Sequence, residues 1–286
     1  MLQIFGAGGS CVASIIASIL LTFIYVLSLY VWRTNLGRDH PSTIKRRFFS
    51  VSCIMLIAPF FTYYFLKQSI QNGSDLYANL GLRWSGLWQA SILPLFLTAT
   101  LFMGPLSMQV LSGYWKIYKE PNFWITNFQD FIWLRNHIVA PISEEWVFRA
   151  CMMPLLLQCL DPLPAVFLGP FLFGIAHFHH MFEQIKAGYN IKTALMLSCF
   201  QFTYTTLFGA YSAFLFMRTG HFIGPVLAHI FCNHMGFPNF GEVMHYPPVQ
   251  RSIIIFAFVL GLTLWLYMLF PITSPAIYDN RLNLGT

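Results

Sequence analysis

The length of its uncharged apolar runs most constrains how this 286-residue chain can fold. Residues 1–32 contain no charged side chain, and several later runs reach or exceed the roughly 18 residues that a helix needs to cross a bilayer. Hydrophobic residues make up 57% of the chain and charged residues only 9%, a composition typical of membrane proteins. Because lipid offers no hydrogen bonds to the backbone, these runs predict an all-α, polytopic bundle of transmembrane helices.

The apolar runs indicate about eight spans. They lie near residues 10–32, 48–66, 87–111, 138–160, 163–182, 194–217, 221–237 and 252–272. The first run is too long for the apolar region of a signal peptide and lacks its basic start, so we expect it to be retained as a span. Residues 121–137 mix aromatic and charged side chains and are typical of an interfacial segment. With no internal repeat or long polar linker, the sequence predicts one membrane-embedded domain over residues 1–286.

The net charge of +6 is distributed unevenly. The segment after the first run contains one acidic residue, Asp39, and five basic residues: Arg33, Arg38, Lys45, Arg46 and Arg47. The positive-inside rule therefore places this loop in the cytosol, and counting spans forward places the glycosylation sequon at Asn72 on the opposite side. The basic residues are not interleaved with surface aromatics, so we expect no nucleic-acid partner.

The six cysteines give no sign of a metal site. Each lies singly in an apolar run, without a C-x-x-C pair or zinc-ligand spacing: Cys11, Cys53, Cys151, Cys159, Cys199 and Cys232. We interpret them as packing residues.

The segment Glu144-Glu145-Trp-Val-Phe-Arg149 is the strongest functional signal in the chain. It places two carboxylates and an arginine at the start of an apolar stretch, in a chain with only ten acidic residues. Charged groups persist at membrane depth mainly where they pair, face a cavity or perform chemistry. Glu145 and Arg149 are one helical turn apart and can pair, whereas Glu144 points about 100° away and stays free of that pair.

Three further polar residues fall in other spans at a similar predicted depth. The predicted topology brings His177 to the cytosolic end of the fifth span and His229 and Asn233 to that of the seventh. A buried core histidine or an interhelical hydrogen bond would explain each residue alone. Their coincidence with the carboxylates on one side instead predicts a catalytic site.

The chemistry of this set suits the hydrolysis of an amide. A carboxylate and a neutral imidazole can activate one water, while an imidazole and an amide on an opposing helix can hold the developing oxyanion. The signatures of other intramembrane proteases are absent from the sequence: H-E-x-x-H, Gly-x-Ser-Gly and Gly-x-Gly-Asp.

The ordered motifs Glu144-Glu145-x-x-x-Arg149, Phe173-x-x-x-His177 and His229-x-x-x-Asn233 resemble a known family. They are similar to the CAAX prenyl endopeptidases of the Rce1 type, within the CPBP intramembrane protease group, over residues 140–236. The resemblance implies a glutamate protease that needs no cofactor. It would remove the last three residues of prenylated Cys-a-a-X proteins such as small GTPases.

The resemblance also implies a role for each motif residue. Glu144 and His177 would activate water. His229 and Asn233 would form the oxyanion site. The family further implies a multi-pass enzyme of the endoplasmic reticulum membrane, in contact with lipid, whose active site faces the cytosol.

Three motif residues would support this site. Glu145 and Arg149 would brace the first motif helix, and Phe173 would shape the pocket. None of the seven motif residues is expected to bind a metal.

Two alternatives remain open. In a zinc-dependent version of the same peptidase, Glu144, His177 and His229 would be the metal ligands. In a transporter, the carboxylates and histidines would form a proton relay, although the repeat and broken-helix signals of many transporters are missing.

Overall fold

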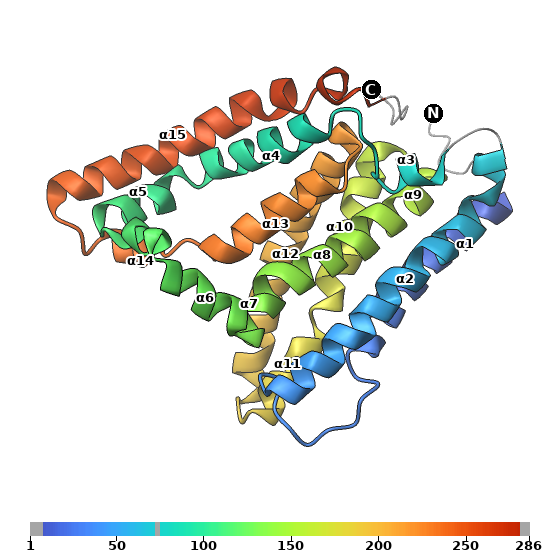
Figure 1. Cartoon of the computed structure of the whole chain (residues 1–286), viewed down its shortest axis with the longest axis horizontal. Helices are drawn as coiled ribbons and strands as arrows, with labels where there is room; N and C mark the ends of the chain where they lie inside the picture. The colour runs from blue at the N-terminus through green and yellow to red at the C-terminus, as the bar shows by residue number, and fades with distance from the viewer. Residues whose placement is uncertain (1–7, 72–74, 281–286) are drawn as a thin grey trace.

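The computed structural model describes residues 8–71 and 75–280, and these residues contain helices and no β-strand (Figure 1). The helices are α1 (Gly8–Ser28), α2 (Pro41–Gln71), α3 (Leu76–Asn79), α4 (Leu87–Leu101), α5 (Met103–Leu111), α6 (Pro121–Gln129), α7 (Phe131–Leu134), α8 (Ala140–Glu145), α9 (Met152–Leu157), α10 (Pro162–Ala176), α11 (His179–Lys186), α12 (Ile191–Thr219), α13 (Ile223–Met235), α14 (Phe240–Val243) and α15 (Pro248–Ile272). The all-α prediction is confirmed. The sequon at Asn72 lies outside the described residues.

Several helices are long and apolar enough to cross a membrane. In the described part of the chain they are Cys11–Ser28, Pro41–Leu66, Pro162–Lys186 and Pro248–Ile272, and the pair α4 and α5, bent by 73°, can form a fifth span. A helix or a run of helices coincides with each of the eight predicted spans. A multi-pass membrane protein is thus confirmed, while the number eight stays a prediction.

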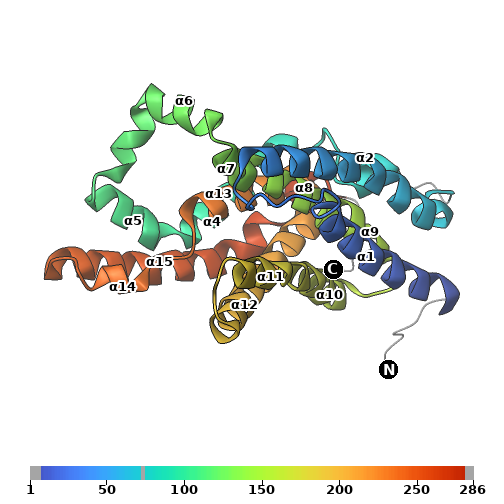
Figure 2. The same cartoon turned by 90° about the horizontal axis from the view of Figure 1, so that it is seen from below.

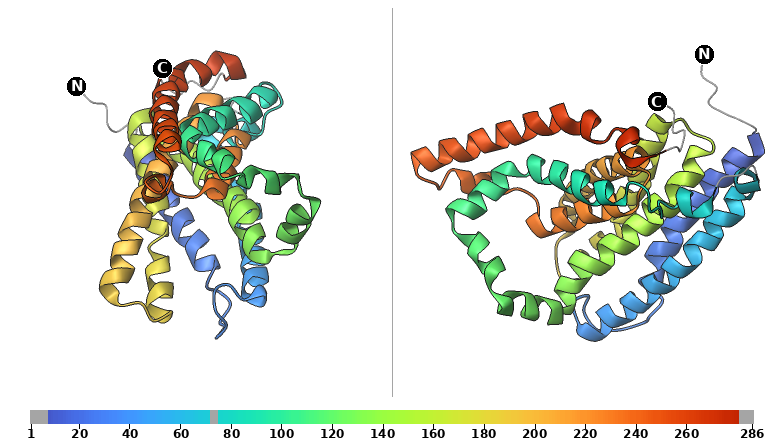
Figure 3. Two further views of the ribbon diagram at one scale, coloured as in Figure 1. Left: turned by 90° about the vertical axis from the view of Figure 1, so that its left-hand side faces the viewer. Right: turned by 45° about the horizontal axis from the view of Figure 1, so that its top comes forward.

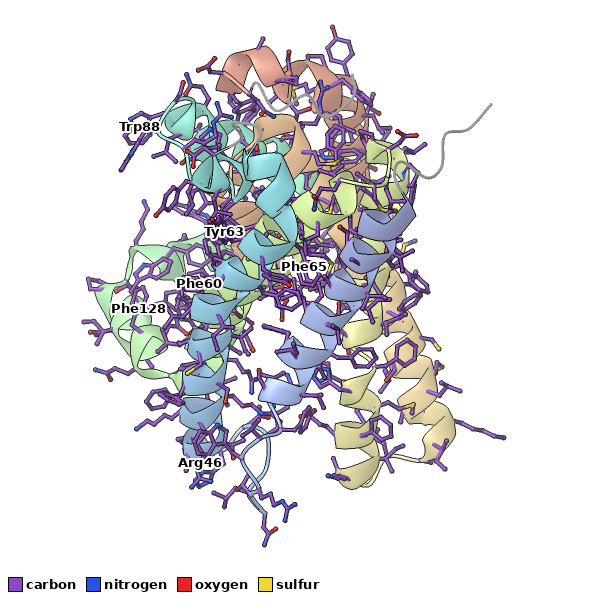
Figure 4. All side chains as sticks on the ribbon, turned by 90° about the vertical axis from the view of Figure 1, so that its right-hand side faces the viewer. Arg46, Phe60, Tyr63, Phe65, Trp88 and Phe128 are labelled. Carbon is purple, nitrogen blue, oxygen red and sulfur yellow. A yellow bond between two sulfur atoms is a disulfide. The ribbon has the colours of Figure 1, made fainter. Side chains whose placement is uncertain are left out.

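The outer surface of the bundle is apolar. Trp84, Trp88 and Phe60 have 90%, 78% and 76% of their surface exposed. Figure 4 shows Phe60 and Trp88 on the outside of the molecule. Exposed aromatic side chains at such density suit a surface that meets lipid rather than water.

Most of the long helices pack in pairs, and α13 lies among them. Helix α1 packs against α2, α4 against α15, and α10 against α12, with α13 in contact with α4, α8 and α12 (Figures 1 and 3). From below, α5 and α6 form an arch at one side of the molecule, where α5 packs against α15 (Figure 2). This arrangement places α8, α10 and α13, which hold the three predicted motifs, in the middle of the molecule.

A disulfide joins Cys11 in α1 to Cys159, just after α9, across 148 residues of sequence. The interpretation of all six cysteines as single packing residues is therefore wrong for these two. Their spacing gave no signal because helix packing, rather than local sequence, brings them together. Cys53, Cys151 and Cys199 are free, as is Cys232.

Candidate active site

The two glutamates lie on α8, between two π-helical turns. These wider turns span Arg135–Val139 and Trp146–Cys151 and join α7, α8 and α9 into one continuous helix. Pro141 and Pro154 follow them, and because proline has no N–H, the carbonyl four residues earlier loses its usual partner. Single π-helical turns often mark functional sites, and here one lies on each side of the Glu144-Glu145 pair.

Glu145 is the centre of a sealed polar cluster. Its side chain is fully buried, and Oε1 lies 3.2 Å from Arg149 Nη1 and 2.7 Å from His229 Nδ1. Ser212 of α12 donates a 2.5 Å hydrogen bond to Oε2. The predicted Glu145–Arg149 pair is thus present. Ser212 was not predicted, and its only sequence signal is a polar residue within an apolar helix.

Arg149 is held by its surroundings as much as by Glu145. Its guanidinium carbon lies 4.4 Å from the ring centroid of Phe173, a cation–π distance. Helix α12 approaches so closely that a Cβ at Gly209 would lie 3.1 Å from Arg149 Nη2. In the described structure Nη1 and Nη2 make no aligned hydrogen bond, so the buried charge is balanced by Glu145 and the aromatic face.

Glu144 lies outside this cluster and lines a cavity. Its side chain is 16% exposed, and Oε2 lies 3.8 Å from His229 Nε2. That separation is longer than a hydrogen bond. His229 thus lies between the two glutamates: Nδ1–H donates to Glu145, while Nε2 lies on the side of Glu144, with which His229 lines the cavity.

His177 faces the same cavity with a defined tautomer. Its Nδ1 lies 2.8 Å from the carbonyl oxygen of Phe173, one turn earlier on α10. A carbonyl oxygen only accepts hydrogen bonds, so Nδ1 holds the proton and a neutral imidazole keeps a lone pair on Nε2. The Phe173 ring lies 4.7 Å from the His177 ring and 6.5 Å from the His229 ring, and so packs beside both imidazoles.

Asn233 is oriented by the neighbouring π-helical turn. Its Nδ2 donates a 2.8 Å hydrogen bond to the backbone carbonyl of Asn136, which leaves its second N–H unused by that bond. Asn233 is exposed to the cavity. The contribution of Asn136 was not foreseen, because a main-chain acceptor has no sequence signature.

One large cavity brings the predicted residues together. Its volume is about 1290 Å³, and Glu144, His177, His229 and Asn233 all line it. Phe173 also lines it, whereas Glu145 and Arg149 lie behind the wall. Most of the remaining lining is apolar and comes from residues of α1, α2, α12 and α15 as well as the motif helices.

Comparisons with known proteins agree on one family. A family model described as type II CAAX prenyl endopeptidase Rce1-like matches residues 126–235. The human protein named CAAX prenyl protease 2 is 44% identical over 96% of this chain and 85% of its own length, and the rat protein of that name is 39% identical over 96% and 84%. The Arabidopsis thaliana protein of that name is 33% identical over 91% and 89%.

No solved structure matches the chain. The identity to the human relative, over nearly the whole chain, decides the family on its own. This protein belongs to the Rce1-like family of CAAX prenyl proteases.

Proposed function

We propose that this protein removes the C-terminal tripeptide from prenylated Cys-a-a-X proteins by water activated at Glu144 and His177. The supporting observation is the placement of Glu144, His177, His229 and Asn233 in one wall of a cavity of about 1290 Å³ that is otherwise mainly apolar. The polar wall suits hydrolysis of an amide, and the apolar remainder suits a prenyl chain.

The first step is attack by water on the scissile carbonyl. The Glu144 carboxylate accepts a proton from the water as it attacks, while the Nε2 lone pair of His177 accepts a hydrogen bond from the same water. The developing oxyanion accepts hydrogen bonds from Asn233 Nδ2–H and from His229 when its Nε2 is protonated. The held proton then passes to the leaving amine, which releases the tripeptide and a prenylcysteine carboxylate.

Glu145 and Arg149 hold this site in place. Glu145 fixes the orientation of His229 through the Nδ1–H hydrogen bond, and Arg149 neutralises Glu145. Phe173 packs beside His177 and His229 and restricts the space for the scissile bond.

The direct test uses the purified full-length protein and a farnesylated Cys-a-a-X peptide. Mass spectrometry should find the peptide shortened by its last three residues, with no cleavage of the same peptide lacking the lipid. Loss of a single residue, or equal cleavage without the lipid, would contradict the proposal.

A zinc-dependent reaction with Glu144, His177 and His229 as ligands is the second candidate. It is favoured by the Glu145–His229 hydrogen bond, because metal-bound histidines commonly donate their other N–H to a carboxylate. We expect elemental analysis of the active protein to find well under one zinc per chain. One tightly bound zinc whose removal tracks the loss of activity would overturn the metal-free mechanism.

The substrates, in this proposal, include small GTPases, and the site faces the cytosol from the endoplasmic reticulum membrane. The cytosolic orientation is supported by the basic residues of the loop between α1 and α2 and of the first turns of α2, which are Arg33, Arg38, Lys45, Arg46 and Arg47. A reporter glycosylation site inserted near residue 40 should stay unmodified in microsomes. Its glycosylation would invert the topology.

A further inference from the structure

Three arginines gather where the cavity meets one end of the bundle. Arg38 comes from the loop between α1 and α2, Arg47 from the first turns of α2, and Arg135 from the turn after α7, and all three line the cavity. Figure 1 shows this loop, the start of α2 and α11 at the same end of the molecule.

Two carboxylates form ion pairs with these three guanidiniums. Arg47 lies 2.8 Å from Glu183 of α11, and Arg135 lies 2.7 Å from Asp39. Arg38 reaches the same two acids only at 3.6 Å and 3.8 Å, longer than a charged hydrogen bond. Its side chain is 42% exposed, so among the three it is the one left most available to a ligand.

The cluster holds more positive charge than its own acids satisfy. Burial, followed by the nearby Arg135, lowers the pKa of Arg38 from its ordinary value, and Glu183 and Asp39 offset this only in part. The Arg47 Nε is buried and has no hydrogen-bond partner in the described structure. An anion bound among these groups would relieve both costs.

A cation suits the same place poorly. Ligand atoms of His179, His180 and Glu183 lie within 4.8 Å of one another, which is close enough for a metal ion. However, Arg38 and Arg47 both contact Glu183 and would repel a metal there.

We propose that Arg38, with Arg47 and Arg135 beside it, binds the terminal carboxylate of the substrate. This inference rests on the proposed function. A Cys-a-a-X substrate cut after the cysteine presents a free carboxylate three residues beyond the scissile bond, or about 10 Å away in an extended chain. The group that recognises it therefore lies away from Glu144 but in the same cavity, as Arg38 does. Such contact would place the scissile bond at Glu144 only when it lies three residues from the C-terminal carboxylate.

The test compares two farnesylated peptides that are identical except at the C-terminus, where one has a free carboxylate and the other an amide. The full-length wild type should cleave the acid with a kcat/KM about 10–100-fold higher, the usual range for losing a charged hydrogen bond. Arg38→Gln should lower kcat/KM for the acid by that factor and leave the amide nearly unchanged, so the ratio approaches one. Arg38→Lys should retain part of the preference.

Two controls separate this role from a general effect of charge or folding. Arg33→Gln removes an exposed arginine of the same loop, and Arg46→Gln removes the exposed neighbour of Arg47; neither residue lines the cavity. Both variants should keep the wild-type ratio. Figure 4 shows Arg46 near the start of α2.

The outcomes distinguish this inference from the function on which it rests. Equal cleavage of acid and amide by the wild type would overturn the carboxylate site and leave the peptidase intact. An equal fall for both peptides in Arg38→Gln would also overturn it, since that pattern indicates a structural role. Cleavage of neither peptide by the wild type would contradict the proposed function itself.

Discussion

Two charge clusters lie beside the same cavity: an inner one around Glu145, and an outer one in which Asp39 and Glu183 pair with Arg38, Arg47 and Arg135. In the inner cluster Glu145 is fully buried and contacts Arg149, His229 and Ser212. In the outer cluster the Glu183 side chain is 16% exposed and contacts Arg38, Arg47 and His180.

The two clusters differ in how much positive charge remains available to a ligand. The inner carboxylate engages groups that are all buried, and Glu145 itself does not line the cavity, so Glu145 orients His229 rather than contacting a ligand. The outer cluster is open to the cavity mouth, and its arginines outnumber its acids. A closed cluster orients a catalytic side chain, whereas an open one with surplus charge is suited to binding.

The largest expected effect lies beside the inner cluster rather than in it. Glu144→Gln removes the proposed base but breaks no ion pair with Arg149, so activity should fall by about 10⁴-fold, the upper end for one general base. Thermal unfolding should change little. The measurement is kcat/KM on the farnesylated peptide together with the melting temperature, and wild-type activity would refute the mechanism.

Breaking the inner cluster should instead destabilise the protein. Arg149→Met leaves the Glu145 carboxylate buried without its counter-ion, which typically costs about 3–5 kcal/mol. The double variant Glu145→Gln with Arg149→Met should be more stable than Arg149→Met alone, because no unpaired charge remains. Thermal unfolding in detergent measures both, and a double variant that is less stable than the single would argue against charge pairing as the cause.

The oxyanion assignment predicts a smaller loss that falls on one kinetic constant. Asn233→Ala should lower kcat by about 10²–10³-fold with little change in KM. Asn136→Ala is the matched control, since it keeps the backbone carbonyl that orients Asn233, and it should lower kcat by much less. A fall confined to KM in Asn233→Ala would assign that residue to substrate binding instead.

The smallest effect on stability is expected in the outer cluster. Glu183→Gln removes a carboxylate whose side chain is 16% exposed, whereas that of Glu145 is fully buried, so loss of the Glu183 ion pair should cost less stability. The melting temperature should therefore fall less than in Arg149→Met. An equal fall in the two variants would remove the distinction between a closed and an open cluster.

Much of the site could be predicted because it depends on spacing within single helices. The four-residue interval between Glu145 and Arg149 fixed their common face, and the loop charges placed His177, His229 and Asn233 on one side. Those residues do line one cavity. Their catalytic roles stay predictions.

The parts that could not be predicted depend on contacts between helices. Ser212 reaches Glu145 across 67 residues, and the disulfide spans 148. The 73° bend between α4 and α5 was not predicted either, although Gly104 and Pro105 directly after it are residues that favour a break. The sequence indicated Arg38 and Arg47 only as determinants of topology and Arg135 only as part of an interfacial segment, because their nearness to the cavity depends on the fold.

The two π-helical turns around Glu144-Glu145 have a consequence for the rotational phase of this helix. Each wide turn holds one residue more than an α-turn, and every residue on an α-helix advances the side chain by about 100°. If the same residues formed a regular α-helix instead, each would advance by about 100°, so the glutamates would face a different direction relative to the segments before and after them. The two wide turns thus set the direction in which Glu144 and Glu145 face relative to the helix segments on either side.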